Sequence, residues 1–429
     1  MIMRKIASEI IKLEKIIPGG QTLGNLADGR KVFVWGALPN EIARIEIYKN
    51  KKSYAEAIAT EILEQSDLRI KSRDECYLST SPWQILNFAE ENRIKSQLIH
   101  DAFMQEKIDL SDFSNEIKTD SRDYFYRNKM EYSLYFMDLD EANQTQNIDF
   151  LQTFSDKEIQ NRGKIFLAFH KRGSHRKIPI LQSSIENPAI FVAAQKMINE
   201  LNSAQIDARK FQHLLARCDQ NGKVSAALFE KFMSHPQMEN LADELLGREY
   251  SYSPNGFFQI NLPIYEMALA EISRFTKDAK NVVDMYSGVG TIGFSVASDK
   301  NLTLVETDKN AFREMQNNIP KDAKNVRAIH AKSEDALDFI TNDATIILDP
   351  PRAGLNEKVI SKLLDIQPPK IIYLSCNPTT QARDIAKLLN ITDKNLEKSA
   401  AKYKIINQQS FNFFPRTPHI ENLIVLENN

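Results

Sequence analysis

Cys376 is the side chain of this sequence whose setting best fits covalent chemistry. It lies in Ser375-Cys376-Asn377-Pro378, directly after the apolar run from Ile371 to Leu374. A thiol just past a strand end, among polar groups, can be exposed and activated as a thiolate nucleophile. The other two cysteines, Cys76 and Cys218, are expected to be small buried hydrophobes.

Glu421 is the candidate general base. It comes at the end of Thr417-Pro418-His419-Ile420-Glu421, immediately before the final apolar strand, Asn422 to Leu426. Prolines on either side of Thr417 and the strand that follows are expected to hold His419 and Glu421 rigidly at a sheet. A carboxylate fixed in this way can accept a proton.

A glycine-rich turn supplies a candidate site for a nucleoside ligand. The segment from Asn281 places an apolar strand before Gly288, Gly290 and Gly293, and a helix follows. Glycines at such a turn let the backbone approach a ligand closely. The same spacing occurs in dinucleotide-binding fingerprints and in plain strand-to-helix turns, so it does not decide the chemistry alone.

Acidic residues at strand ends sharpen this assignment. Asp284 ends the first strand, and Glu306 ends the next apolar run, where a carboxylate can accept both ribose hydroxyls. A dehydrogenase would use a carboxylate at the position of Glu306 in the same way, to bind the ribose of NAD. A third strand, however, is followed by Asp349-Pro350-Pro351, whose prolines fix a stiff turn at the ligand-binding edge. This turn favours methyl transfer, because a methyltransferase uses the position to shape the gap between its cofactor and the acceptor base.

The order of expected elements predicts three domains. Residues 1–62 contain short strands and turns, which indicate a small β-barrel. Residues 63–253 mix strands and helices as an α+β domain, with a helix over 84–108 that is expected to pack on the third domain. Residues 254–429 alternate strands and helices, which predicts a doubly wound, Rossmann-like α/β domain carrying all the residues above.

Composition and charge limit the class of protein. The 429 residues are 42% hydrophobic and 26% charged, an ordinary mixture for a folded, soluble chain. The net charge is −2, but residues 1–60 carry ten Lys and Arg against six Asp and Glu, a local net of +4. This excess marks either a nucleic-acid-binding face or a solvated face that blocks edge pairing. With no disulfide framework and no apolar run of roughly 18 residues, we expect a cytoplasmic protein without a membrane span.

With these pieces assembled, the chain resembles the S-adenosylmethionine-dependent RNA uracil-5-methyltransferases, which make 5-methyluridine in ribosomal and transfer RNA. The resemblance runs nearly from end to end. Its most specific motifs are Ser375 to Pro378 and Asp349 to Leu355, and the C-terminal signature ending at Glu421 also matches, except that Asn412 stands at a usual Asp. Further motifs that resemble the family are Tyr126 to Glu131, Phe257 to Asn261, and, for an N-terminal RNA-binding TRAM domain, Gly19-Gly20 and Ala37 to Pro39.

The resemblance implies a role for each candidate residue. Cys376 would be the nucleophile and Glu421 the base. S-adenosylmethionine would be bound by Gln259, Tyr286, Gly288, Gly290, Glu306 and Asp349. Uracil C5 alone is too weak a nucleophile to attack a sulfonium methyl group, but addition of a thiolate to C6 places negative charge on C5. Removal of the C5 proton by the base then releases the thiolate.

One departure from the family concerns a metal cluster. Many members hold an iron–sulfur cluster with four cysteines, three of them just before a Trp-Gln pair. Here the run before Trp83-Gln84 contains only Cys76, and the whole chain has three cysteines. We therefore expect no iron–sulfur cluster and no other metal.

The sequence leaves several functions open. The expected partner is RNA, with ribosomal RNA favoured by the barrel and transfer RNA as the alternative. A non-catalytic RNA-binding protein on the same fold, or a cytosine-5-methyltransferase using the same thiol addition, are further alternatives. Intact Cys376 and Glu421 argue against the first, and the Ser-Cys-Asn-Pro setting argues against the second. We expect a monomer.

Overall fold

The computed structural model describes residues 8–114, 116–137, 164–181, 183–206, 210–233, 236–321, 323, 325–391 and 402–429. The chain forms two compact units. The first comprises Met1–Lys15, Gln21–Ile85 and Asp123–Leu241, and the second comprises Ile16–Gly20, Leu86–Arg122 and Ala242–Asn429. Each unit therefore combines segments that are distant in sequence. Among the described residues, no helix is both long and apolar enough to cross a membrane.

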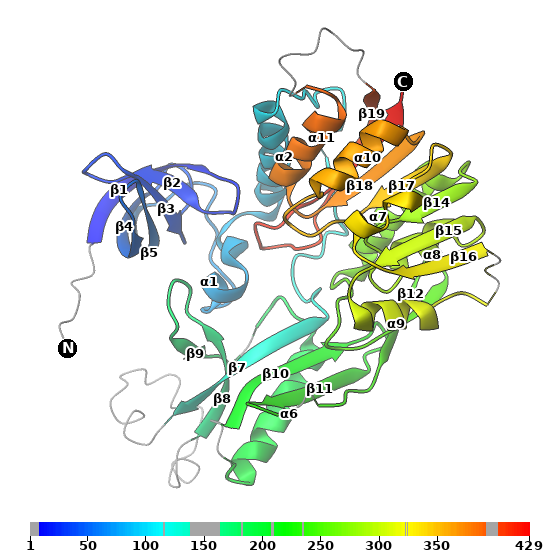
Figure 1. Cartoon of the computed structure of the whole chain (residues 1–429). Coiled ribbons are helices and arrows are strands. Elements are labelled where there is room, and N and C mark those ends of the chain that lie inside the picture. Colours follow the sequence, from blue (N-terminus) through cyan, green and yellow to red (C-terminus); the bar gives the residue numbers. More distant parts are fainter. Residues whose placement is uncertain are drawn as a thin grey trace. The chain divides into compact units, whose positions relative to one another are not determined.

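The first unit contains a closed barrel of five strands, which confirms the fold predicted for the N-terminal region (Figure 1). The strands are β1 (Ser8–Ile16), β2 (Thr22–Asn25), β3 (Lys31–Trp35), β4 (Ile42–Asn50) and β5 (Tyr54–Glu64). β1 pairs with β4 to close the barrel, and β3 runs parallel to β5. Alternate residues of β4, namely Ala43, Ile45 and Ile47, are buried in the barrel core, because successive side chains of a strand point to opposite faces.

The first unit also contains an antiparallel sheet and a long helix (Figure 1). In the order β11-β10-β7-β8-β9, the strands are Val224–Glu230, Phe211–Cys218, Lys129–Met137, Lys164–His170 and Lys177–Pro179. Helix α6 (Pro188–Ser203) packs on this sheet through Ile190, Ala194 and Ile198. These residues recur every four positions, so they line one face of the helix.

A buried carboxylate ties the segment after the barrel to a distant loop. This segment contains α1 (Tyr77–Thr80) and the short 3-10 helix η1 (Pro82–Ile85). Asp74 accepts hydrogen bonds from the Nε2 of Gln84 at 2.8 Å and from the backbone N–H of Ser184, 110 residues away, at 2.9 Å. The hydroxyl of Ser184 donates to the same carboxylate. Both oxygens of the buried carboxylate thus accept hydrogen bonds, as removal of the group from water requires.

The second unit is built on an eight-stranded sheet. The strands are β6 (Ile117–Lys118), β14 (Asn281–Asp284), β15 (Asn301–Glu306), β16 (Asn325–His330), β17 (Ala344–Leu348), β18 (Lys370–Ser375), β19 (Tyr403–Phe411) and β20 (Glu421–Asn428). The helices are α2 (Phe88–Gln105), α7 (Leu262–Thr276), α8 (Thr291–Ala297), α9 (Lys309–Asn317), α10 (Glu357–Ile366) and α11 (Pro378–Leu388). The hairpin of β12 (Leu241–Leu245) and β13 (Arg248–Tyr252) precedes α7.

The strand order β16-β15-β14-β17-β18-β20-β19-β6 confirms the predicted doubly wound, Rossmann-like class. The chain moves outward in one direction from β14 to β16 and in the other from β17 to β18, with parallel pairing throughout these five strands. Right-handed crossovers in opposite directions place α8 and α9 on one face and α10 and α11 on the other. Strand β20 is antiparallel to β18, so its first residue lies at the carboxyl end of β18.

Helix α2 holds the segment that leads into β20. Lys95 is fully buried, and its Nζ donates to the carboxylate of Glu91 at 2.8 Å and to the side-chain oxygen of Asn412 at 2.7 Å. The carboxylate of Glu91 accepts the backbone N–H of Arg416 at 3.0 Å. The guanidinium of Arg416 donates to the carbonyl of Leu86 at 2.6 Å. Residues 412–416 are therefore held by a buried ion pair, in addition to the bond from the backbone N–H of Asn412 to the carbonyl of Lys118 in β6 at 2.9 Å.

Candidate active site

The candidate residues of the second unit gather at the carboxyl edge of its sheet. β14 pairs with both β15 and β17. The point at which successive strands begin to be added in the opposite direction along the sheet therefore lies between β14 and β17. Asp284 ends β14, Glu306 ends β15, Asp349 follows β17 and Cys376 follows β18. Ligands of open α/β sheets bind at such a reversal, outside the carboxyl ends of the strands. The sequence predicted that these residues share one edge of the sheet, and the structure places them at the carboxyl ends of its parallel strands.

The glycine turn is fixed by a buried acid. The carboxylate of Asp284 accepts the backbone N–H of Gly293 through one oxygen, Oδ2, at 3.0 Å. Its other oxygen, Oδ1, is buried without a hydrogen-bond partner among the described residues. Burial raises the pKa of Asp284 to about 7. Gly290 has φ of +88°, and a Cβ there would meet the ring of Phe294 at 2.2 Å, so only glycine fits this turn.

Glu306 is held against the same turn. Its Oε2 accepts the backbone N–H of Gly288 at 2.8 Å, and its Oε1 accepts that of Asp308 at 2.6 Å. These bonds orient the carboxylate at the mouth of the turn. Each carboxylate oxygen has a further lone pair, so the group can still accept hydrogen bonds from ribose hydroxyls.

The remaining cofactor candidates surround this turn. Tyr286 is half-buried, and burial raises the pKa of its hydroxyl while a hydrogen bond with Ser333 partly offsets that rise. Gln259 is buried in the segment that leads into α7. Asp349 is half-buried, and burial, followed by the charge of Asp284, raises its pKa to about 7. Two neighbouring carboxyls with raised pKa values form a site that favours a cationic ligand, because a positive charge stabilises their ionised forms.

Cys376 and Glu421 meet at the end of an antiparallel ladder. Ser375 of β18 lies opposite Asn422 of β20, so the next step of the register brings Cys376 level with Glu421. Cys376 is half-buried, whereas Glu421 is 5% exposed. Burial, with the charge of Glu421 next in size, raises the pKa of the Cys376 thiol to about 11. Burial and then Asp349 raise the pKa of Glu421 well above its usual range.

The raised thiol pKa differs from the activated thiolate that the sequence suggested. Cys376 lies past a strand end as expected, but two acidic neighbours oppose its ionisation. Arg352 acts in the opposite direction. Its guanidinium lowers the pKa of both Cys376 and Glu421, and its Nη2 lies 2.9 Å from Nδ1 of His419. Arg352 is the cation of this site, and it was given no role from the sequence.

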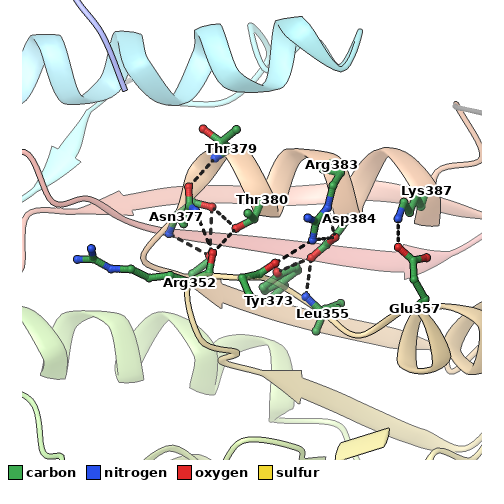
Figure 2. Close-up of polar contacts among 12 residues, drawn as sticks. Arg352, Leu355, Glu357, Tyr373, Asn377, Thr379, Thr380, Arg383, Asp384 and Lys387 are labelled. Atoms are coloured by element: carbon green, nitrogen blue, oxygen red, sulfur yellow. Dashed lines mark hydrogen bonds and ion pairs between the residues drawn. The ribbon is translucent and has the colours of Figure 1, made fainter. Parts of the chain in front are cut away.

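A buried aspartate fixes the loop that carries Arg352 (Figure 2). The carboxylate of Asp384, on α11, accepts the backbone N–H of Leu355 at 2.8 Å and the hydroxyl of Tyr373 at 3.0 Å. It also pairs with the guanidinium of Arg383 at 2.7 Å. The carbonyl of Arg352 itself accepts the side-chain amide of Asn377 at 2.9 Å. The loop after β17 and the loop after β18 are thus joined directly beside the thiol.

Two groups of supporting residues escaped the sequence analysis for different reasons. Arg352 lies inside the motif Asp349 to Leu355, and its charge complementarity with Cys376 and Glu421 was the signal available, whereas Asp384 follows the motif Ser375 to Pro378 and gave no such signal. Glu91 and Lys95 are four residues apart on a helix, a spacing that usually marks a surface ion pair. Only their contact with residues 412–416 reveals that this pair is buried.

The three cysteines do not form a four-thiolate site. Cys76 and Cys218 are buried in the first unit, and Cys376 belongs to the second. Burial raises the pKa of Cys76 to about 12, which disfavours the thiolate that a metal would need. Within the described residues, no three His, Cys, Asp or Glu side chains are grouped as metal ligands. The residues present do not fit an iron–sulfur cluster.

Comparisons with known proteins bear on the second unit and on the whole chain. Residues 236–429 match the family model described as tRNA (Uracil-5-)-methyltransferase. The chain is 26% identical to an RNA methyltransferase of Treponema denticola, over 98% of this chain and 99% of that protein. It is 28% identical to one of Fusobacterium nucleatum, over 99% and 97%. Most of its sequence therefore has a counterpart in each relative.

A solved structure shares its fold with most of this chain. The structure is a Pyrococcus abyssi tRNA (uracil-54, C5)-methyltransferase in complex with S-adenosyl-L-homocysteine. It superposes with a TM-score of 0.71 at 18% identity and covers 98% of this chain and 100% of the other. The barrel, the antiparallel sheet and the doubly wound sheet therefore recur together in that protein.

Proposed function

We propose that the chain is an S-adenosylmethionine-dependent RNA uracil-5-methyltransferase that methylates C5 of a specific uridine through a covalent bond between Cys376 and uracil C6. The match of residues 236–429 to the tRNA (Uracil-5-)-methyltransferase family and the similarity to RNA methyltransferases along nearly the whole chain support this proposal. The observation that supports this mechanism is the register that brings Cys376 level with Glu421, with Arg352 acting on both. A nucleophile and a base on opposite sides of one ladder can both reach a single pyrimidine ring.

Cys376 would act first. Its sulfur forms a bond to C6, and the electrons of the C5–C6 double bond move to C5 and O4 of the uracil. The thiol first loses its proton to water, which can reach the half-exposed Cys376, and the guanidinium of Arg352 stabilises the resulting thiolate. Asn377 and Asp384 fix the loop that carries Arg352, so they act as positioning residues.

Glu421 would complete the reaction. Once C5 carries its new methyl group, the Glu421 carboxylate takes the remaining C5 proton. The electrons of that C–H bond re-form the C5–C6 double bond, and the bond from C6 to the Cys376 sulfur breaks. Burial keeps Glu421 away from bulk water, so its raised pKa makes it a stronger proton acceptor when ionised.

The residues around the glycine turn fit a nucleoside cofactor that carries positive charge. Gln259, Tyr286, Gly288, Gly290, Glu306 and Asp349 would hold S-adenosylmethionine. The buried, unpartnered Oδ1 of Asp284 and the raised pKa of Asp349 support this assignment, because a cation compensates both carboxylates. When bound, S-adenosylmethionine supplies an electrophilic methyl group.

We propose ribosomal RNA as the substrate, on the basis of the N-terminal barrel, whose net charge of +4 in residues 1–60 fits an RNA partner of either kind. Transfer RNA is a second candidate, favoured by the Pyrococcus abyssi protein, whose fold covers 98% of this chain, including the barrel. Residues 1–62 and 63–253 would bind RNA, and 254–429 would carry the chemistry. We further propose that the protein acts as a cytoplasmic monomer without an iron–sulfur cluster.

The test is to map 5-methyluridine in RNA from cells with and without this protein. Loss of one 5-methyluridine in 23S ribosomal RNA would support the proposal, and loss in transfer RNA would support the second candidate. Purified protein should restore the same residue, whereas Cys376→Ala should lower its formation by about a thousandfold or more. Modification of a cytidine, or full activity of Cys376→Ala, would contradict the proposed reaction.

A further inference from the structure

A basic hairpin in the first unit has no part in the chemistry proposed above. Strands β8 and β9 form this hairpin (Figure 1). Residues 164–179 contain five Lys and Arg and no Asp or Glu. Four of these cations, Lys171, Arg172, Arg176 and Lys177, lie in the eight residues from 170 to 177 around the tip. The net positive charge per residue is higher in this hairpin than in residues 1–60, where six Asp and Glu offset ten Lys and Arg.

The backbone defines the tip without using its charged side chains. The N–H of Lys171 donates to the carbonyl of Arg176 at 2.7 Å, and that of Ser174 donates to the carbonyl of Lys171 at 3.0 Å. The side chains of Lys171, His175 and Arg176 are exposed. They can therefore be replaced without loss of the hydrogen bonds that shape the turn.

The tip is anchored on the barrel. The guanidinium of Arg172 lies 4.2 Å from the ring centroid of Trp35, and its Nε donates to the carbonyl of Leu78. Gly173 has φ of +74°, and a Cβ there would meet the ring of Tyr48 at 2.8 Å. The hairpin thus rests on two aromatic rings through Arg172 and Gly173. This anchoring holds the backbone of the turn that carries the remaining basic side chains.

Neighbouring cations extend the basic surface of the tip. Burial and then the charge of Lys231 lower the pKa of Lys177, so these two ammonium groups lie close enough to repel each other. Cations gathered in this way are attracted to a polyanion, and each that contacts a phosphate releases a counterion.

We propose that the tip of the β8–β9 hairpin, through Lys171, His175 and Arg176, binds the phosphate backbone of the RNA substrate outside the active site. The inference rests on the proposed function for the identity of the polyanion. The expected contacts are independent of base sequence, because Lys and Arg at a turn recognise phosphate charge rather than base edges. Extrusion of the target base costs a few kcal/mol, and backbone contacts of this kind can hold the surrounding RNA during that step.

The test compares two double variants that lose the same charge. Lys171→Gln/Arg176→Gln removes two tip cations. Lys277→Gln/Lys280→Gln removes two exposed cations just before β14, at the sheet edge opposite the glycine turn. Binding of a 23S ribosomal RNA transcript and of mixed transfer RNA is measured by filter retention at several salt concentrations. Methyl transfer to whichever RNA the wild type modifies gives kcat and KM.

The tip variant should bind RNA about tenfold more weakly at 0.15 M salt, and its slope of log affinity against log salt should be shallower by about 1.4, or 0.7 for each lost phosphate contact. KM for RNA should rise about tenfold, with kcat and S-adenosylhomocysteine binding unchanged. The control variant should match the wild type. Equal slopes for the two double variants would overturn the inference. Absence of 5-methyluridine with wild-type protein would instead overturn the proposed function, while the binding comparison still tests the hairpin.

A single-residue variant tests the placement of the tip separately from its charge. Gly173→Ala keeps every cation but drives a methyl group into the Tyr48 ring. RNA affinity should fall although the net charge is unchanged. An unaltered affinity would show that charge alone suffices and that the anchoring on Tyr48 plays no part.

Discussion

Ser375 at the end of β18 lies opposite Asn422 of β20, and this pairing sets Cys376 level with Glu421 although 45 positions separate them. The relationship depends on β20 running antiparallel to β18. A parallel strand would present its first residue at the opposite edge of the sheet. The nucleophile and the base therefore come together because the last strand reverses direction.

Replacing the proposed base should trap the reaction midway. In Glu421→Gln, Cys376 can still add to C6, but no carboxylate removes the C5 proton, so the thiolate is not released. A protein–RNA species that survives denaturing electrophoresis should accumulate. The double variant Glu421→Gln/Cys376→Ala should form none, which controls for tight non-covalent binding. Wild-type turnover by Glu421→Gln would place the base elsewhere.

Arg352 should control the reactivity of the thiol. Because its guanidinium lowers the pKa of Cys376, Arg352→Gln should raise that pKa further above about 11. The rate of Cys376 alkylation by iodoacetamide rises with pH as the thiolate forms, and the variant should react about tenfold more slowly per unit of pKa increase. Peptide mass spectrometry separates Cys376 from buried Cys76, which should react slowly in both proteins. Equal Cys376 rates would show that Arg352 does not act on the thiol.

Cofactor affinity should depend on pH around neutrality. The pKa of both Asp284 and Asp349 is raised to about 7, so below that pH both carboxyls hold protons that a cationic ligand must displace. Affinity for S-adenosylmethionine should rise from pH 5 to 7 by up to about tenfold per pH unit for each carboxyl that ionises, and then level off. Calorimetry in buffers of different ionisation enthalpy should detect the released protons. A flat profile would contradict this prediction.

The same two carboxyls should affect the stability of the ligand-free protein. A folded-state pKa above the unfolded value means that the folded chain binds extra protons between about pH 4 and pH 7. Their contribution to stability is therefore present at low pH and is lost as pH rises through that window. The thermal shift produced by S-adenosylmethionine should accordingly be larger at pH 8 than at pH 5, whereas S-adenosylhomocysteine, which lacks the sulfonium charge, should show a smaller dependence.

Asp384 should be the most sensitive position of the loop network in Figure 2. Asp384→Asn puts an amide N–H₂ among donors from Leu355, Tyr373 and Arg383, and should destabilise the protein by about 2–4 kcal/mol. Glu357→Gln is the matched control, because Glu357 pairs with Lys387 of the same helix α11 at the surface. That change should cost about 0–0.5 kcal/mol. Equal denaturant midpoints for the two variants would contradict the role of Asp384.

The protein should function without iron. Purified anaerobically, it should be colourless, contain no stoichiometric iron and keep its activity after chelation, because three cysteines cannot supply four thiolates. Asp74 and Gln84 already tie the segment near Cys76 to Ser184. Asp74→Ala should therefore lower stability by about 2–4 kcal/mol without changing metal content. Iron near four atoms per chain, with visible absorption, would contradict this expectation.

The doubly wound sheet could be predicted because its parallel strands are buried on both faces. Ile346 to Leu348 and Ile371 to Leu374 are continuous apolar runs, which only fully covered strands carry. The apolar run from Asn422 to Leu426 likewise predicted a final strand that begins just after Glu421. In the structure Glu421 is the first residue of that strand, β20. In each case the signal lies within a few consecutive residues.

Properties that depend on several segments could not be predicted. The protonation of Cys376 is set by burial and by Glu421, Arg352 and Asp349, which come from two segments that are separate from Cys376 in the sequence. The buried pair of Glu91 and Lys95 looks in the sequence like one on a solvated helix face, since the residues that cover it are more than 300 positions away. The pattern of residues within one helix does not show which distant segment of the chain will cover it.

The contact between Lys95 and Asn412 has a consequence for synthesis on the ribosome. Helix α2 is made early, yet the residue that receives its buried ammonium group is translated 317 positions later. At about 5–20 residues per second, the helix waits roughly 15–60 s for its partner. During that interval the apolar face of α2 and the pairing edge of β6 have no native cover from β19 and the residues that follow it. The nascent chain therefore depends on protection of residues 86–122 until its last strands emerge.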